Sequence, residues 1–403
     1  MLKINEKKDC CGCEACVNIC PKRCIAMQAD VEGFLYPLID MTSCIDCHLC
    51  EKTCPMITPY ASEGENAQTV ECYAAVNTNQ EILHQSSSGG VFFNLVKHFI
   101  EEKQGYVVGV IIDDYGVVRH QIANTLSGCK DFLGSKYVQS SIDSIYQSIL
   151  DLLKEGNWVL FSGTPCQTAG IRKFLKKRYE TLVTVDFACH GVPSPTVWKD
   201  YRGQLCDRHK TETISHVSFR NKKYGWKEYS LSYRWNEHGE TCIKHSVDSY
   251  LQAFKQGVTL RPSCYECPFK YYKGRFSDIT LCDYWRVRSD EPLFYNKYGV
   301  SGVILNTNTG HQVWKEICTG FKVKEISIDA LFNSNSSLVK QTPYNRKREQ
   351  FFKEYSQSGD LCKLLDKYIC QNPIDEFSKQ FKSALGYMVY RMKILVYKLS
   401  KTK

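Results

Sequence analysis

The sequence predicts a small cysteine-rich module, then a larger mixed α/β domain, then a helical C-terminal tail, in an overall α+β or α/β fold class. Three observations support this prediction. Ten of the 22 cysteines lie in the first 54 of 403 residues. Apolar strand-like runs then alternate with stretches of helical periodicity. The last part of the chain has a helical, basic pattern. We expect domain boundaries at residues 1–58, 71–335 and 336–403.

Composition narrows the class of protein. The chain carries 52 Lys and Arg against 43 Asp and Glu, a net charge of +9, and its 43% hydrophobic content excludes a disordered or fibrous protein. The best apolar run, residues 106–112, is far shorter than the roughly 18 residues that a membrane span needs. No secretory signal precedes Cys10, so we expect a cytoplasmic protein whose thiols bind metal.

The N-terminal cysteines form a duplicated motif, C-x2-C-x2-C-x3-C-P, at residues 10–21 and 44–55. This spacing is typical of bacterial two-cluster ferredoxins, in which the fourth cysteine of each run crosses to the other cluster. We predict two [4Fe–4S] clusters, one held by Cys10, Cys13, Cys16 and Cys54 and one by Cys44, Cys47, Cys50 and Cys20. The alternative is a pair of zinc sites. We interpret Cys11 and Cys24 as packing residues.

The larger domain follows a polar linker at residues 56–70. Its pattern predicts strands at 72–76, 106–112, 158–161 and 182–187, and helices that begin at Gly90, near 143–155 and at 165–177. Strands and helices that alternate at this spacing favour a parallel or mixed sheet, and residues 214–235 suggest an antiparallel addition.

Two features of this domain suggest ligand binding. The tract Ser87, Ser88, Gly89 and Gly90 precedes a helix, where free backbone N–H groups suit a phosphate, although serine there is also an ordinary helix cap. Cys166 and Cys189 each follow a predicted strand. If these strands are parallel neighbours, both thiols lie at the carboxyl edge of the sheet. Together with Cys264 and Cys267, they form a hypothetical third [4Fe–4S] site; zinc, a redox dithiol and unrelated thiols are the alternatives.

Taken in order, these motifs resemble the coenzyme F420 hydrogenase/dehydrogenase beta subunit family over residues 8–310. The shared motifs are SSGG (87–90), GSKYVQS (134–140), GTPCQ (163–167), CHGVPSP (189–195), RPSCYECPFK (261–270) and SDITLCDYW (277–285). The resemblance implies FAD and strengthens the third cluster. The chain departs from the expected pattern at Cys282 and Arg286, where we expect glycines, so its flavin or substrate face is expected to differ from that of the deazaflavin-reducing members.

A flavin is the converter that this chemistry needs, because clusters pass single electrons whereas a hydride carries two. We expect FAD contacts at Ser87, Ser88, Gly89 and Gly90, with Lys136 and Tyr137 nearby. His190 is a candidate catalytic residue for proton transfer, although a hydrogen-bonded core histidine is the alternative. The basic segment 220–227 suits an acidic substrate tail or a solvated face.

The predicted function is an oxidoreductase that passes electrons between these clusters, FAD and a hydride-accepting organic substrate such as coenzyme F420. A non-catalytic electron-transfer subunit, a reductase of a sugar-linked substrate in polysaccharide biosynthesis and a zinc-stabilised interaction protein are the alternatives. We expect an electron donor or acceptor protein and a small-molecule hydride acceptor as partners, and no nucleic acid. The sequence leaves the oligomeric state open.

The C-terminal segment 377–403 has an apolar stripe at helical spacing and, from Phe377 onward, basic residues but no acidic ones. Such a helix is suited to docking on protein or to lying on an anionic membrane surface. Both interpretations stay open, so peripheral attachment at the inner face of the membrane is part of the expected localisation.

Overall fold

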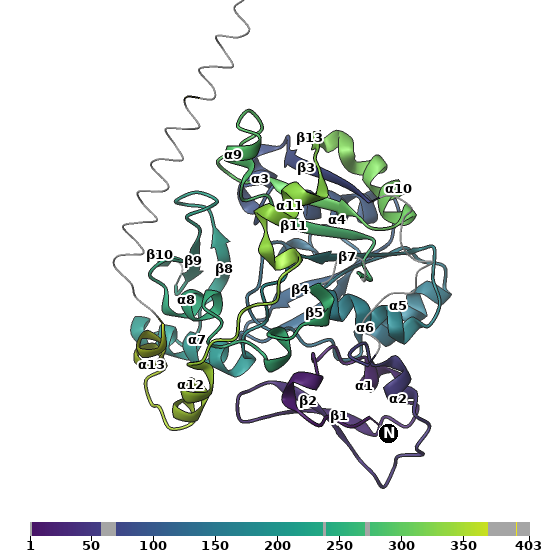
Figure 1. Cartoon of the computed structure of the whole chain (residues 1–403), viewed down its shortest axis with the longest axis vertical. Coiled ribbons are helices and arrows are strands. Elements are labelled where there is room, and N and C mark those ends of the chain that lie inside the picture. The colour runs from purple at the N-terminus through teal and green to yellow at the C-terminus, as the bar shows by residue number, and fades with distance from the viewer. Residues whose placement is uncertain (1, 58–69, 237–238, 271–274, 370–391, 393–403) are drawn as a thin grey trace, which may run out of the picture.

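An eight-stranded mixed sheet forms the centre of the molecule (Figure 1). The computed structural model describes residues 2–57, 70–236, 239–270, 275–369 and Met392. From one edge to the other, the strands are β13 (Phe321–Glu325), β3 (Glu71–Asn77), β12 (Ser301–Leu305), β11 (Ile279–Asp283), β7 (Leu182–Phe187), β6 (Val159–Ser162), β4 (Tyr106–Ile112) and β5 (Val118–Ala123).

The four central strands β11, β7, β6 and β4 run parallel, whereas the strands outside them pair antiparallel. The parallel pairing of β6 with β7, which aligns Phe161 with Thr184, confirms the predicted arrangement. β7 is buried at five consecutive residues from Leu182 to Asp186, as expected for a parallel strand covered on both faces. The carboxyl ends of these strands therefore meet at one edge.

Helices cover both faces of this sheet. α4 (Val91–Glu101) and α10 (Asn308–Ile317) pack on one face, and α5 (Ile145–Lys154) and α6 (Pro165–Leu175) pack on the other. α6 begins with a capping box between Thr164 and Gln167 and has proline at its first position, which fixes its start directly after β6. Short helices complete this region: α3 (Gln80–Gln85), α9 (Val287–Asp290) and α11 (Ile328–Ser334).

The N-terminal cysteine module, residues 2–57, packs on α5 and α6. It contains α1 (Ala15–Ile19), the antiparallel hairpin of β1 (Ile25–Ala29) and β2 (Leu35–Ile39), and α2 (Leu49–Thr53). The buried Glu14 carboxylate accepts the backbone N–H groups of Ile142 at 3.0 Å and Asp143 at 2.8 Å. These contacts fix the module to the body of the protein at the start of α5.

A second layer of structure lies beside the large sheet. β8 (Ser215–Asn221), β9 (Ser230–Arg234) and β10 (Glu240–Lys244) form an antiparallel sheet, which confirms the predicted antiparallel addition. This sheet shares a core with α7 (Pro195–His209), α8 (Ser249–Lys255), α12 (Arg348–Tyr355) and α13 (Leu361–Tyr368). Residues 348–368, which we expected in a C-terminal tail, are therefore packed against the body.

Two expectations concern segments that lie mostly outside the described residues. Most of the predicted linker at 56–70 and, apart from Met392, the whole basic segment 377–403 lie outside the described residues. Within the described part of the chain, no helix combines the length and apolarity needed to cross a membrane.

Candidate functional site

The duplicated cysteine motif folds into a duplicated local structure. α1 and α2 each begin after a residue in the left-handed conformation, Glu14 at φ 60° and His48 at φ 56°. Each helix ends at the fourth cysteine of its run, where the N–H groups of Cys20 and Cys54 turn back to carbonyls three residues earlier. The same spacing therefore gives similar local structure: in each run the third cysteine, Cys16 or Cys50, lies in the short helix, and the first two precede it.

One predicted set of four thiols, together with Cys24, lines a common pocket: Cys20, Cys44, Cys47 and Cys50. The Sγ atoms of Cys20 and Cys24 lie 3.4 Å apart. Cys24, which we interpreted as a packing residue, is thus a fifth thiol at this pocket. The pairing of Cys20 with the second run follows the crossed pattern that the motif predicts.

The other N-terminal set also lies together. Burial raises the pKa of Cys16, and the neighbouring side chains of Cys10 and Cys54 raise it further. The thiols of Cys10 and Cys54 therefore both lie near Cys16, an arrangement that the crossed pattern predicts. Because burial disfavours thiolates, a positively charged metal centre would offset the cost of ionising such a group of cysteines.

The third predicted set comes from three distant segments. Cys166 lies in the first turn of α6, Cys189 follows β7, and Cys264 and Cys267 lie in the loop after residue 261, yet all four line one pocket. Burial, followed by the thiols of Cys189 and Cys267, raises the pKa of Cys264. Thus the carboxyl edge of the parallel strands and one loop place these four thiols together.

Cys11 also lines the third pocket. Its side chain, followed by burial, raises the pKa of Cys166 well above its usual range. Within the described ranges, no three Cys, His, Asp or Glu side chains converge closely enough to hold a single metal ion. The thiols of a [4Fe–4S] cube do not converge in this way, because each of them binds a different iron atom.

A larger cavity of about 450 Å³ opens at the same edge of the sheet. Its walls come from the segments that follow β6, β7 and β11, from the start of α4 and from the loop at residues 132–138. This is the position at which open α/β sheets bind ligands. Four consecutive residues, Cys189, His190, Gly191 and Val192, line both this cavity and the pocket of the third thiol set.

Three buried polar atoms at this cavity lack a hydrogen-bond partner among the described residues: Ser88 Oγ, His190 Nε2 and Arg220 Nε. Buried polar groups are nearly always paired, so a cluster of unpaired ones along a cavity wall fits a polar ligand. The size and the mixed polar and apolar wall suit an organic ring system carrying polar substituents, which is the character of a flavin.

Residues 156–330, which include β6, β7, β11 and all four thiols of the third set, match the family model for the C-terminal part of the coenzyme F420 hydrogenase/dehydrogenase beta subunit. Over these residues the chain is similar to that family. Among solved structures, the chain is similar to one from the xenon-derivatised F420-reducing [NiFe] hydrogenase complex from Methanosarcina barkeri. The identity is 15%, the TM-score is 0.46, and the match covers 77% of this chain and 97% of that chain. No curated protein sequence matches the chain.

The serine–glycine tract at residues 87–90 lies mostly at the cavity. Ser87, Ser88 and Gly90 line it, whereas Gly89 packs against the sheet and donates its N–H to Ser301 Oγ at 2.9 Å. A Cβ atom at Gly89 would lie 2.2 Å from the carbonyl oxygen of Ala75. Glycine at this position therefore lets the tract approach β3 closely.

The two other predicted flavin neighbours, Lys136 and Tyr137, also line the cavity. The Lys136 ammonium group donates to three carbonyls of its own loop, including that of Leu133 at 2.9 Å, and burial lowers its pKa to about 7. It therefore closes the loop on itself. Tyr137 stacks on Phe254 with ring centroids 4.5 Å apart, and its hydroxyl accepts a hydrogen bond from Arg220 at 3.2 Å.

His190 lies in the wall between the two cavities. Its ring makes an edge-to-face contact with Phe254 at 5.1 Å, and its backbone carbonyl accepts a hydrogen bond from Thr342. Burial and the nearby charge of Lys270 lower the pKa of His190 to about 4, so the imidazole is neutral at neutral pH.

Arg220 is a site residue that the sequence pattern placed only in a basic loop. Its guanidinium pairs with Asp283 at 3.0 Å and lies over the rings of Tyr229 at 4.4 Å and Trp285 at 5.1 Å. Lys222 is likewise buried, donating to three backbone carbonyls. A signal for Arg220 was present in the segment SDITLCDYW at residues 277–285, which supplies its partners Asp283 and Trp285.

Proposed function

We propose that the protein is an iron–sulfur flavoprotein oxidoreductase. In this proposal residues 1–58 hold two [4Fe–4S] clusters, and residues 71–335 hold a third cluster and FAD. Electrons pass through the three clusters to or from an organic substrate that exchanges hydride, such as coenzyme F420. The family of residues 156–330 supports the general class, and an electron donor or acceptor protein is the expected partner.

One observation carries the proposal. The pocket of Cys166, Cys189, Cys264 and Cys267 and the cavity of about 450 Å³ share the wall formed by residues 189–192. A group held by these thiols and a ring held in the cavity would be separated by little more than that wall. A cluster and a flavin this close together could convert single electrons into an electron pair. A purely structural protein would have no reason to place the two cavities side by side.

When bound, the clusters supply single electrons and the flavin supplies hydride chemistry. The chain's own residues position these groups. Ser88 Oγ offers a hydrogen bond to a ligand in the cavity, and Arg220, fixed by Asp283, presents positive charge and its free Nε. His190 Nε2, which is buried without a hydrogen-bond partner among the described residues, would exchange a proton with a substrate or ring in the cavity.

The decisive experiment is anaerobic purification followed by measurement of iron and flavin. Three cubes and one flavin predict about twelve iron atoms and one FAD per chain. Protein with the expected iron but no flavin would overturn the enzyme assignment and favour an electron relay. A colourless protein containing zinc would instead indicate an interaction protein and overturn the proposal entirely.

A further inference from the structure

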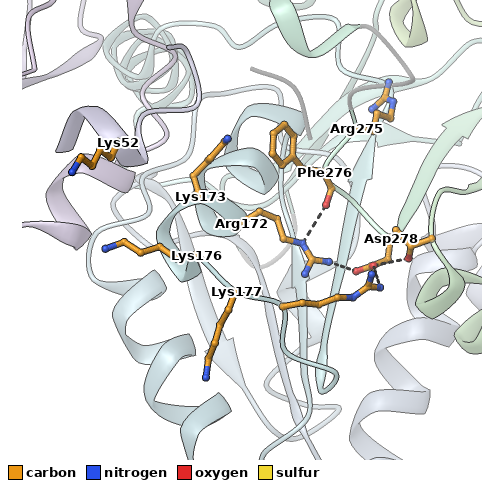
Figure 2. A pocket seen from close by; sticks show the side chains of 10 residues that line it. Lys52, Arg172, Lys173, Lys176, Lys177, Arg275, Phe276 and Asp278 are labelled. Carbon is orange, nitrogen blue, oxygen red and sulfur yellow. Dashed lines mark hydrogen bonds and ion pairs between the residues drawn. The ribbon is translucent and has the colours of Figure 1, made fainter. Parts of the chain in front are cut away.

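A strongly basic cavity of about 260 Å³ lies away from the cofactor cavity, between the N-terminal cysteine module and the end of α6 (Figure 2). Seven of the residues that line it are cationic: Lys52, Arg172, Lys173, Lys176, Lys177, Arg178 and Arg275. Cys166 lies at the opposite end of α6, about 15 Å away at 1.5 Å per residue. The basic cavity is thus at the amino end of the strands whose carboxyl ends form the candidate site.

The arginines of this cavity form a fixed floor. Arg172 pairs with the buried carboxylate of Asp278 at 2.6 Å, and Arg178 approaches the same carboxylate at 3.7 Å. Arg275 pairs with Asp186 at 2.9 Å. Asp278 also accepts from the backbone N–H and the hydroxyl of Thr184, both at 2.8 Å. Three arginines therefore share two carboxylates, so their charge is largely balanced.

The positive charges of the lysines around the rim are not balanced by carboxylates in this way. Lys52, Lys173, Lys176 and Lys177 form no ion pair with any acidic side chain that the structure describes. Cations in the last turn of a helix offset the helix dipole, which accounts for Lys173. The same effect accounts for Lys52 in the last turn of α2, whereas Lys177 lies beyond the end of α6. The seven cations and two carboxylates leave an excess of five positive charges.

The directions of the lysines indicate what kind of anion would fit. In Figure 2 the ammonium groups of Lys52, Lys173, Lys176 and Lys177 spread outward from the rim and do not converge on one point. A small anion is bound by donors that converge on it, whereas spread charges match an extended surface of opposite sign. The arrangement therefore favours a protein with an acidic face over a single phosphate.

The position of Lys52 connects this surface to electron transfer. Lys52 is exposed and lies in α2 two residues from both Cys50 and Cys54, one thiol from each N-terminal set. α2 packs directly on α6. A protein bound over the four lysines would thus cover the part of α2 between Cys50 and Cys54, one thiol of each predicted cluster.

We propose that the basic cavity and its four rim lysines dock an acidic protein that carries single electrons. This inference rests on the proposed function, since it assumes clusters in the N-terminal module. Each docking event moves one electron: the carrier is oxidised by one electron and one N-terminal cluster is reduced by one. Two such events, with one proton from solvent, supply the equivalent of one hydride, and the reverse direction uses the same surface.

The test uses the anaerobic, cluster-loaded holoprotein and a reduced ferredoxin with an acidic surface as probe. The variant carries Lys173→Gln, Lys176→Gln and Lys177→Gln. We expect its second-order rate of reduction by the ferredoxin to fall about tenfold at low salt, with a flatter dependence on ionic strength and a matching loss of affinity. A matched control, Lys97→Gln, Lys199→Gln and Lys210→Gln, removes the same charge elsewhere and should leave the rate within about twofold.

A viologen of zero net charge serves as a second reductant, and it should reduce the wild type and both triple variants equally. Docking at this surface would be overturned if the ferredoxin reduced the wild type and the variant at Lys173, Lys176 and Lys177 at equal rates. It would also be overturned if the reduction rate fell equally in both triple variants. Protein docking would also be overturned if inorganic phosphate bound only the wild type and the ferredoxin rates stayed unchanged in the variant. Ferredoxin that binds the wild type more tightly than the variant, without electron transfer, would support docking and overturn the proposed function.

Discussion

The Arg261 side chain donates a 2.8 Å hydrogen bond from Nε to the backbone carbonyl of Cys10. Its two other nitrogens donate to Leu35 O at 2.9 Å and Gln139 Oε1 at 3.0 Å, and the side chain is completely buried. Arg261 is three residues from Cys264. One guanidinium group therefore joins a first-run cysteine, the β1–β2 hairpin and the loop that brings Cys264 to the third pocket.

Replacing Arg261 should loosen the N-terminal cysteine module. Arg261→Met leaves three acceptors without their donor, and we expect a loss of about 2–4 kcal/mol in the free energy of unfolding. Limited proteolysis under anaerobic conditions should cut the variant faster between the module and the body. Arg234→Met, at an exposed position, should change stability by less than about 0.5 kcal/mol. Equal protease resistance of Arg261→Met and the wild type would contradict this role.

Removing one thiol of the third set should remove one cluster. Cys166→Ser is expected to lower the iron content from about twelve to about eight atoms per chain and to remove one component of the electron paramagnetic resonance spectrum after reduction. Cys129→Ser is the control, because Cys129 is a buried thiol in the core beneath α4, away from the three sets. Loss of iron from both variants would show that destabilisation, and not ligation, causes the effect.

A methyl group at Gly89 should disturb flavin binding. In Gly89→Ala the new Cβ would meet Ala75 O at 2.2 Å and the backbone nitrogen of Ser301 at 2.6 Å, so the tract at residues 87–90 must shift. We expect a loss of about tenfold in FAD affinity, measured by quenching of flavin fluorescence. Gly203→Ala, with open space around the added atom, should bind FAD as the wild type does. Unchanged affinity in Gly89→Ala would place the flavin elsewhere.

The buried Asp248 should make stability depend on pH. Burial raises the pKa of Asp248 to about 6, while its carboxylate accepts from Tyr201 and from the N–H of Leu251. The folded protein thus holds this proton more tightly than the unfolded chain does, so stability falls as pH rises from 4 through 6. Between pH 5 and 7 the wild type should lose about 1 kcal/mol relative to Asp248→Asn. Denaturant unfolding of both proteins at the two pH values tests this, and parallel curves would contradict it.

Local pattern was enough to predict much of the central sheet. The apolar run at 182–187 and the Thr-Pro start of the helix at 165 identify β7 and α6, and a strand–helix–strand unit makes β6 and β7 parallel neighbours. From this, the meeting of Cys166 and Cys189 at one edge follows directly. The crossed position of Cys54 beside the first run likewise follows from the duplicated motif.

Such local patterns did not predict the contacts between segments that lie far apart in the sequence. Cys264 reaches the third pocket because the backbones of Pro193 and Leu260 pair and because Arg348 donates to Leu260 O at 2.9 Å. Lys136, which the sequence predicts only as a neighbour of the flavin, donates to carbonyls of its own loop. The basic cavity joins Lys52 to residues more than a hundred positions later, and no local spacing encodes that meeting.

The crossing of the last cysteine of each run into the neighbouring run's set makes the two halves of the N-terminal module interdependent. Deleting either repeat would leave one predicted set with three of its four thiols and the other with a single thiol. With two clusters bound as proposed, maturation would therefore be all-or-none at this end of the chain: both inorganic centres would be inserted into one entire unit, and half of the duplication would not serve as a simpler carrier.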